Sequence, residues 1–199
     1  MRAMELGLRR HWIFDLDGTL TVAVHDFDDI RRELGLPADR PILEALAERP
    51  PEEARALGAR LDALEAELVT ETSAAPGAHA LLTHLDGLGC QLGILTRNTL
   101  SNAVATLTHC GLERFFAADA VLGREEAPPK PSPDGIHHLL RGWTATAASG
   151  VMVGDFRFDL EAGRAAGVAT VSVDPSGAHP HGTLADHRVD HLAQLVALL

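Results

Sequence analysis

The pattern of apolar positions near the start of the chain predicts a strand followed by helices. Residues 12–14 form a short apolar run that Asp15 and Asp17 follow closely, as expected for a buried strand with polar residues at its carboxyl end. From about residue 22 to 73, apolar residues instead recur every three or four positions between prolines. This region predicts two to four helices, too few for an independent domain. We expect them to form a cap that packs over the end of the first strand.

Apolar runs and amphipathic stretches then alternate to the end of the chain. Strands are predicted over residues 91–96, 120–123, 151–155 and 168–173, and helices over 79–88, 100–110, 133–140, 160–166 and 191–199. Residues 174–187, rich in Gly, Pro and His, predict a loop. Strands that alternate with helices indicate a parallel sheet covered on both faces. The predicted fold class is α/β, with a core of residues 1–21 and 74–199 and an all-helical cap of residues 22–73.

Composition and charge narrow the range of partners. The chain of 199 residues is 46% hydrophobic and carries a formal net charge of −11, which argues against nucleic acid and anionic membranes. No apolar run approaches the roughly 20 residues of a membrane span, and the first strand has no signal-peptide core. Cys90 and Cys110 match no redox or zinc spacing. We expect a cytoplasmic protein, a monomer or weak homodimer, that binds neither nucleic acid nor membrane.

Four polar motifs lie at the ends of predicted strands or in the loops that follow them. They are Asp15-x-Asp17-Gly18-Thr19, Thr96-Arg97-Asn98, Lys130-Pro131 and Gly154-Asp155-x-x-x-Asp159. Each motif alone has an ordinary explanation, such as helix capping or a solvated surface charge. Because the carboxyl ends of parallel strands lie along one edge of a sheet, however, the four motifs are expected to converge there.

Convergence of the acids would create strong repulsion, and this points to a metal ion. Asp15, Asp155 and Asp159 would lie within a few ångströms of one another, and each close pair costs about 4 kcal/mol at an effective dielectric constant of about 20. One lysine cannot offset this repulsion, but a divalent cation can. A ligand set made only of oxygens favours Mg²⁺ over zinc or copper. The metal in turn favours an anionic oxygen substrate, for which phosphate is the natural candidate.

A phosphate bound at this edge would give each motif a role. Asp15 would be the nucleophile and form an aspartyl-phosphate, while Asp17 would protonate the leaving oxygen and later deprotonate the attacking water. The Thr96 hydroxyl and the amides that begin the next helix would hold phosphate oxygens. Lys130 would place a positive charge between nucleophile and phosphate, and Mg²⁺ would orient the phosphate and shield the carboxylates.

The four motifs, in this order and with a helical insertion after the first, resemble the haloacid dehalogenase-like superfamily. The closer resemblance, over about residues 11–173, is to its phosphoglycolate-phosphatase-like members with a small helical cap. The resemblance implies a three-layer Rossmann-like sandwich. It also implies a set of site residues: Asp15, the Asp17 carbonyl and Asp155 for Mg²⁺, Asp159 for the waters of the metal, and Thr96 and Lys130 for phosphate.

Two positions in the motifs distinguish among the activities of that superfamily. Its dehalogenases lack the second acid of the first motif, so Asp17 disfavours dehalogenation. Its sugar-phosphate mutases usually carry Glu-Asp in the fourth motif, so Gly154-Asp155 favours a phosphatase. We therefore expect a Mg²⁺-dependent phosphoric monoester hydrolase acting on a small phosphorylated metabolite. The alternatives are a sugar-phosphate phosphomutase and a non-catalytic binding protein on the same fold.

Three other residues of these motifs, and one residue beside the first motif, are further candidates. Gly18, Arg97 and Asn98 are expected to help to bind the phosphate or the leaving group, with helix capping and surface charge as the alternative for Arg97 and Asn98. His25 is a candidate contact for the substrate or the cap hinge, with an ordinary loop histidine as the alternative. The insertion is shorter than the cap of typical phosphoglycolate phosphatases, so the resemblance does not identify the substrate.

Overall fold

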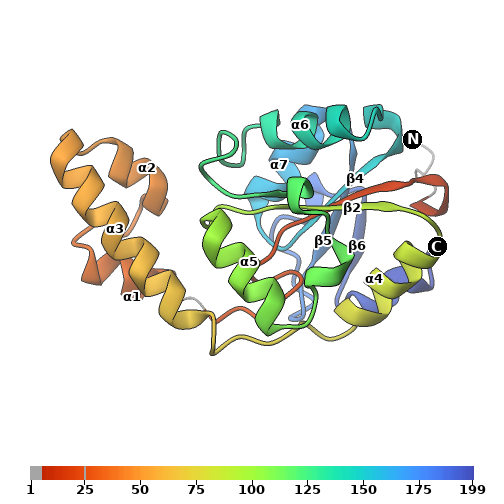
Figure 1. Ribbon diagram of the computed structural model, residues 1–199, viewed down its shortest axis with the longest axis horizontal. Coiled ribbons are helices and arrows are strands. Elements are labelled where there is room, and N and C mark those ends of the chain that lie inside the picture. Colours follow the sequence, from red (N-terminus) through yellow and green to blue (C-terminus); the bar gives the residue numbers. More distant parts are fainter. Residues whose placement is uncertain (1–5, 25) are drawn as a thin grey trace.

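The computed structural model describes residues 6–24 and 26–199, which fold around a parallel sheet (Figure 1). In this part of the chain the strands are β1 (His11–Phe14), β2 (Gln91–Leu95), β3 (Val121–Leu122), β4 (Gly150–Gly154), β5 (Ala169–Val173) and β6 (His187–Val189). Their order is β3-β2-β1-β4-β5-β6, and all neighbours pair in parallel. The chain therefore runs outward from β1 in both directions, and ligands of such sheets bind where the strand order reverses.

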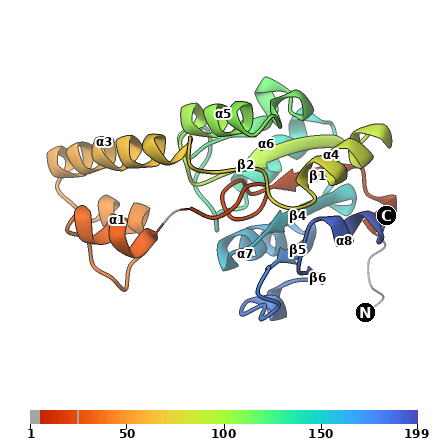
Figure 2. The same cartoon turned by 90° about the horizontal axis from the view of Figure 1, so that it is seen from below.

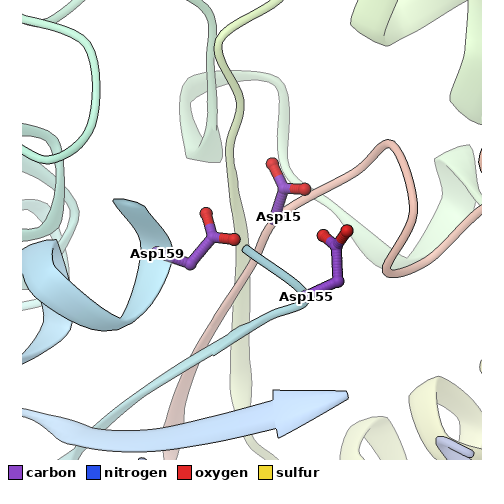
Figure 3. A group of neighbouring side chains, drawn as sticks. All are labelled: Asp15, Asp155 and Asp159. Atoms are coloured by element: carbon purple, nitrogen blue, oxygen red, sulfur yellow. The ribbon is translucent and has the colours of Figure 1, made fainter. Parts of the chain in front are cut away.

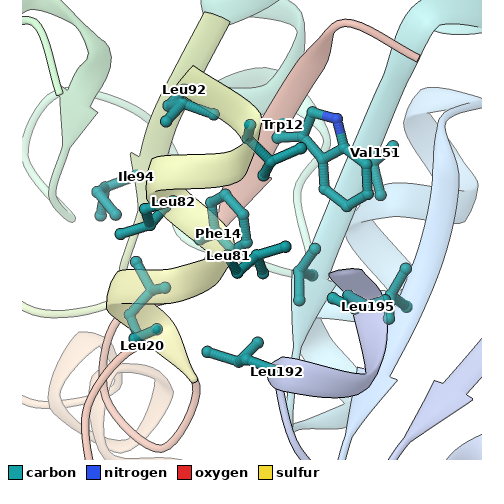
Figure 4. Packing of buried hydrophobic residues seen from close by; sticks show 14 of the residues in the cluster. Trp12, Phe14, Leu20, Leu81, Leu82, Leu92, Ile94, Val151, Leu192 and Leu195 are labelled. Carbon is teal, nitrogen blue, oxygen red and sulfur yellow. The ribbon is translucent and has the colours of Figure 1, made fainter. Parts of the chain in front are cut away.

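Helices cover both faces of the sheet and make a sandwich of three layers (Figures 1 and 2). α4 (Ala78–Gly87), α5 (Leu100–His109) and α8 (Ala193–Val196) pack on one face, and α6 (Asp134–Gly142) and α7 (Arg157–Ala166) on the other. Because side chains alternate along a strand, Trp12 and Phe14 pack on the first face and Ile13 on the second. Figure 4 shows Trp12 and Phe14 among leucines of α4 and α8, including Leu81 and Leu195. The predicted α/β fold class is confirmed.

Three helices between β1 and α4 lie to one side of the sandwich (Figures 1 and 2). They are α1 (Phe27–Glu33), α2 (Ile42–Ala47) and α3 (Pro51–Leu68). They share a hydrophobic cluster of their own, to which Ile30 and Ile42 belong. The Asp26 carboxylate accepts hydrogen bonds from the backbone N–H groups of Asp28 and Asp29, both at 3.0 Å. Asp26 therefore begins α1 as an N-cap.

The two segments that join these helices to the sandwich lie side by side. Thr21 and Ala74 form an isolated antiparallel bridge, and the Val22 N–H donates to the Ser73 carbonyl at 2.9 Å. The bridge falls beside the predicted limits of the cap, residues 22–73. The division of the chain into core and cap stays a prediction.

The sequence pattern missed β6 and overestimated the last helix. Only Val189 of the three β6 residues is buried, so no apolar run marks the strand. It forms because its backbone pairs with β5 at the edge of the sheet. The helix expected over 191–199 is limited to α8, which has four residues. Among the described helices, none has the combined length and apolar character needed to cross a bilayer.

Candidate active site

Three carboxylates meet at the carboxyl end of the sheet, where the strand order reverses. Asp15 follows β1, Asp155 follows β4, and Asp159 lies in the first turn of α7. Carboxylate oxygens of Asp15, Asp155 and Asp159 lie within 4.8 Å of one another, and Figure 3 shows the three side chains gathered at one place. The structure therefore brings together the acids whose convergence the sequence predicts.

Lys130 joins this acidic group from the loop that follows β3. Its side chain is only 2% exposed, and its Nζ lies 2.5 Å from Asp15 Oδ1 and 2.6 Å from Asp159 Oδ1. Burial alone would lower the pKa of this lysine, but the two carboxylates outweigh burial and raise it. Lys130 is therefore a fixed positive charge between two of the acids.

The acids outnumber this cation, and their pKa values reflect the imbalance. Burial raises the pKa of Asp155 to about 8, and repulsion from Asp15 and Asp159 acts in the same direction. Burial also raises the pKa of Asp159, to about 6, and that of Asp15, although Lys130 opposes both shifts. Acids that retain protons in this way favour the binding of a further positive charge. Three converging carboxylates offer only oxygen ligands, so the site fits a hard divalent cation such as Mg²⁺.

Two small residues after β1 let Asp155 approach. The Thr19 hydroxyl donates a hydrogen bond to Asp155 Oδ1 at 3.0 Å. Gly18 has a φ of +88°, which strains any other residue, and a Cβ atom there would lie 2.7 Å from Asp155 Oδ2 and displace that carboxylate. Sequence reasoning did not single out Thr19 as a functional residue, although it stands in the first motif. The expected contact between Gly18 and phosphate stays a prediction.

Thr96 and Asn98 follow β2 and face the first motif. The buried Thr96 Oγ1 accepts a hydrogen bond from the Asn98 backbone N–H at 3.1 Å. The Asn98 side-chain amide donates to Asp17 Oδ2 at 3.4 Å. The N-cap residue of α5 is Thr99, whose hydroxyl accepts a hydrogen bond from the Asn102 N–H. Capping of this helix therefore does not explain Thr96 and Asn98, which lie beside the acids.

Arg97 is engaged with protein groups. Its guanidinium donates to Glu44 Oε2 of α2 at 2.6 Å and to the Lys130 carbonyl, and it lies 4.7 Å from the centroid of the Phe158 ring. Arg97 therefore links a cap helix to the sandwich. Its expected contact with the leaving group stays a prediction, and His25 lies outside the described residues.

A cavity of about 410 Å³ opens above these residues, between the sandwich and the cap helices. Asp15, Asp17, Thr96, Lys130 and Asp155 line it on the side of the sandwich. The cap contributes, among others, Phe27, Arg31, Ile42, Leu61 and Glu65. Its volume lies in the range of about 300–1,000 Å³ that is usual for small-molecule sites.

Sequence reasoning also missed a contact between cap and sandwich beside this cavity. Arg124, in the loop after β3, donates to both Glu65 oxygens, at 3.2 and 2.9 Å, and also to Asp62 of α3. The same guanidinium reaches the Arg97 carbonyl at 3.0 Å. Burial raises the pKa of Glu65 to about 7, although Arg124 opposes the shift. The only signal in the sequence is that Arg124 follows a strand at the same edge as the other motifs.

Known proteins that resemble this chain include phosphatases. Residues 12–173 match the family of haloacid dehalogenase-like hydrolases. A haloacid dehalogenase-like hydrolase domain-containing protein of Arabidopsis thaliana is 30% identical, over 94% of this chain and 82% of that protein. A phosphoglycolate phosphatase of Pseudomonas syringae is also 30% identical, over 85% of this chain and 70% of its own length.

Solved structures show the same fold. A haloacid dehalogenase-like family hydrolase from Streptococcus pneumoniae superposes with a TM-score of 0.75 at 21% identity, over 96% of this chain and 98% of its own. The expected family is therefore confirmed, together with its Rossmann-like three-layer fold. With its matched region extending from the first strand to the fifth, the chain belongs to the haloacid dehalogenase-like hydrolases.

Proposed function

We propose that the protein is a Mg²⁺-dependent phosphatase that hydrolyses a small phosphorylated metabolite through an aspartyl-phosphate at Asp15. Its family and its phosphoglycolate phosphatase relatives make it a phosphoric monoester hydrolase. The observation that carries the mechanism is the group of three carboxylates within 4.8 Å around a buried lysine, at one side of a cavity. Such a group is suited to binding a metal ion and an anionic oxygen substrate together.

The surroundings of Asp15 suit a nucleophile. Lys130 holds Asp15 Oδ1 at 2.5 Å, which fixes the carboxylate and leaves its other oxygen to attack phosphorus. The bond between Asp15 and phosphorus forms as the bond from phosphorus to the leaving oxygen breaks. The Lys130 ammonium and the Thr96 hydroxyl then lie where they can stabilise the charge on the phosphoryl oxygens.

Asp17 is placed to move the proton in both steps. It lines the cavity, and the Asn98 amide, 3.4 Å away, orients its carboxylate. In the first step Asp17 gives its proton to the leaving oxygen. In the second it accepts a proton from the water that attacks phosphorus, and the bond to Asp15 breaks to release phosphate.

The bound Mg²⁺, held by Asp15, the Asp17 carbonyl and Asp155 and supported through its waters by Asp159, would neutralise the carboxylates and polarise the phosphoryl group. Gly154 favours this phosphatase over the mutase alternative. A Cβ atom at position 154 would lie 2.3 Å from the Asp159 side chain, so the Glu-Asp pair of the mutases does not fit this arrangement.

The proposal is tested by phosphate release from a panel of phosphorylated metabolites. We expect hydrolysis with Mg²⁺ and none with a chelator. Isomerisation of a sugar phosphate without phosphate release would instead identify a mutase, and a lack of both reactions would indicate a binding protein. Oligomeric state, cellular location and the absence of nucleic-acid and membrane partners stay predictions from the sequence.

A further inference from the structure

Aromatic side chains concentrate at the cavity beside the proposed catalytic group. The chain has six phenylalanines, and three of them, Phe27, Phe156 and Phe158, line this cavity. Phe27 comes from the cap and is 50% exposed, while Phe156 comes from the sandwich and is 46% exposed. Large apolar side chains left half-exposed inside a cavity usually mark a surface that a ligand covers.

The fourth motif brings two of these rings close to the acids. Phe156 directly follows Asp155, and Phe158 directly precedes Asp159. The two rings meet edge to face, with 5.1 Å between their centroids. A substrate whose phosphate lies among the acids therefore has its leaving group next to an aromatic surface.

Two guanidinium groups extend this surface. Arg97 and Arg157 both lie over the Phe158 ring, at 4.7 and 4.8 Å from its centroid. A guanidinium stacked in this way keeps a flat face that another planar group can stack on. Rings and guanidiniums together suit a planar ligand better than a puckered or branched one.

Three charged residues of the cap side, Arg31, Arg40 and Glu65, form ion pairs with protein groups, while Asp39 also lines the cavity and the buried Arg31 Nε has no hydrogen-bond partner among the described residues. Arg31 pairs with Asp28 at 2.5 Å, and Arg40 pairs with Glu48 at 2.5 Å. Glu65 is held by Arg124. A sugar with many hydroxyl groups would have to compete for these side chains, whereas an aromatic ring needs none of them. Pro41, Ile42, Leu43 and Leu61 add further apolar lining.

We propose that the preferred substrate is a phosphomonoester whose leaving group carries a planar aromatic ring, which lies between Phe27 and Phe156 and stacks against the arginines at Phe158. This inference rests on the proposed phosphatase function and specifies its substrate class. It differs from phosphoglycolate, whose two-carbon leaving group would touch little of this surface.

Matched phosphate esters test this substrate class. Benzyl phosphate and cyclohexylmethyl phosphate have primary alcohol leaving groups of similar size and reactivity, but only the first is planar. We expect kcat/KM in Mg²⁺ to be about tenfold higher for benzyl phosphate, since two aromatic contacts of this kind act together. Phosphoglycolate should be hydrolysed less efficiently than either ester. Equal values for the two ring-bearing esters, or a preference for phosphoglycolate, would overturn the proposal.

Two variants and a binding measurement complete the test. Phe156→Leu keeps apolar volume but removes one of the two rings, so it should lower the ratio of the two esters from about ten to about three. Val104→Ala, an exposed change outside the cavity, should leave the ratio unchanged. Calorimetry on the wild-type protein with benzylphosphonate and cyclohexylmethylphosphonate needs no turnover. Tighter binding of benzylphosphonate without hydrolysis of any ester would support the aromatic site and reject the phosphatase. Hydrolysis of the esters without a preference for the benzyl compounds would support the phosphatase and reject the aromatic site.

Discussion

Asp15 and Asp17 stand two residues apart but in different surroundings. Asp15 is buried against Lys130, among the acids of the candidate metal site. Asp17 is half-buried, lines the cavity and has the Asn98 amide beside its carboxylate. The first position suits a group that must be held still, and the second suits a group that exchanges protons with substrate and water. The two acids are therefore expected to respond differently to the same substitution.

Asp15→Asn should abolish turnover without unfolding the protein. The amide is a poor nucleophile, and loss of a nucleophile typically lowers kcat by a factor on the order of 10⁴ or more. Lys130 keeps Asp159 as a partner in the variant, and one repelling negative charge is removed, so the melting temperature should hardly fall. Phosphate release and thermal unfolding check both points, with the exposed change Asp86→Asn as control. Retained activity would reject the nucleophile assignment.

Asp17→Asn should have an effect that depends on the leaving group. A general acid contributes about 10²- to 10⁴-fold in rate, but an ester with an acidic leaving alcohol needs little protonation. We therefore expect the loss in kcat to be larger for benzyl phosphate than for p-nitrophenyl phosphate. Equal losses for the two esters would argue that Asp17 acts by placing the substrate rather than by giving a proton.

At the scale of residues, the sequence predicted best which acids and which lysine lie together in the site. Asp15, Lys130, Asp155 and Asp159 could be placed together because each follows a strand, and strand ends share an edge. The engagement of Arg97 by Glu44 was not predictable in this way. It depends on how a cap helix packs against the sandwich, and no local pattern in the sequence encodes that distance.

At the scale of elements, Arg124 connects α3 to the loop that carries the candidate phosphate-binding residues. It bonds to Glu65 and Asp62 on the helix and to the Arg97 carbonyl in the loop. A single side chain, which is only 11% exposed, therefore contacts both the cap helix and the loop.

Arg124→Ala should destabilise the protein by leaving Glu65 buried without its partner. Removing one member of a buried pair costs about 3–5 kcal/mol, so the free energy of unfolding should fall by that order. The double variant Arg124→Ala, Glu65→Ala should lose less than the sum of the single variants. Arg55→Ala, on the exposed side of α3, the helix that carries Glu65, should change the free energy of unfolding by less than about 1 kcal/mol. Denaturant unfolding measures all four, and additive losses would contradict the coupling.

Glu65 should also make stability depend on pH. Its pKa is about 7 in the folded protein, above the ordinary value of 4.5, so the folded state holds more protons between these values. The contribution of Glu65 to the free energy of unfolding is therefore highest below pH 4.5. It falls as pH rises through 7, by at most about 3 kcal/mol. Glu65→Gln cannot titrate, so the difference between wild type and variant should decline over this window. A difference that is flat with pH would show that Glu65 titrates normally.

The strand that sequence patterns predicted least well lies at one edge of the sheet. β6 has one buried residue and follows a loop rich in Gly, Pro and His, so its strand character comes from pairing with β5 and not from its own residues. β1 and β4 are different because they are buried on both faces, and their apolar runs reveal them directly.

For the whole molecule, the acidic cluster couples metal binding to stability and to pH. The pKa of Asp155 is about 8 in the folded protein, above its ordinary value of 3.8, so the folded state holds the extra proton and the stability contributed by this group falls as pH rises through that window. A divalent cation competes with this proton and binds the folded state, which stabilises it by RT ln(1 + [Mg²⁺]/Kd).

Added Mg²⁺ should therefore raise the melting temperature more at about pH 8.5 than at about pH 6. Asp155→Asn should remove most of this increase, whereas Asp86→Asn should keep it. A chelator should reverse the increase and stop hydrolysis at the same concentration, because one ion serves both purposes, and stabilisation that is equal at the two pH values would show that the metal binds away from Asp155.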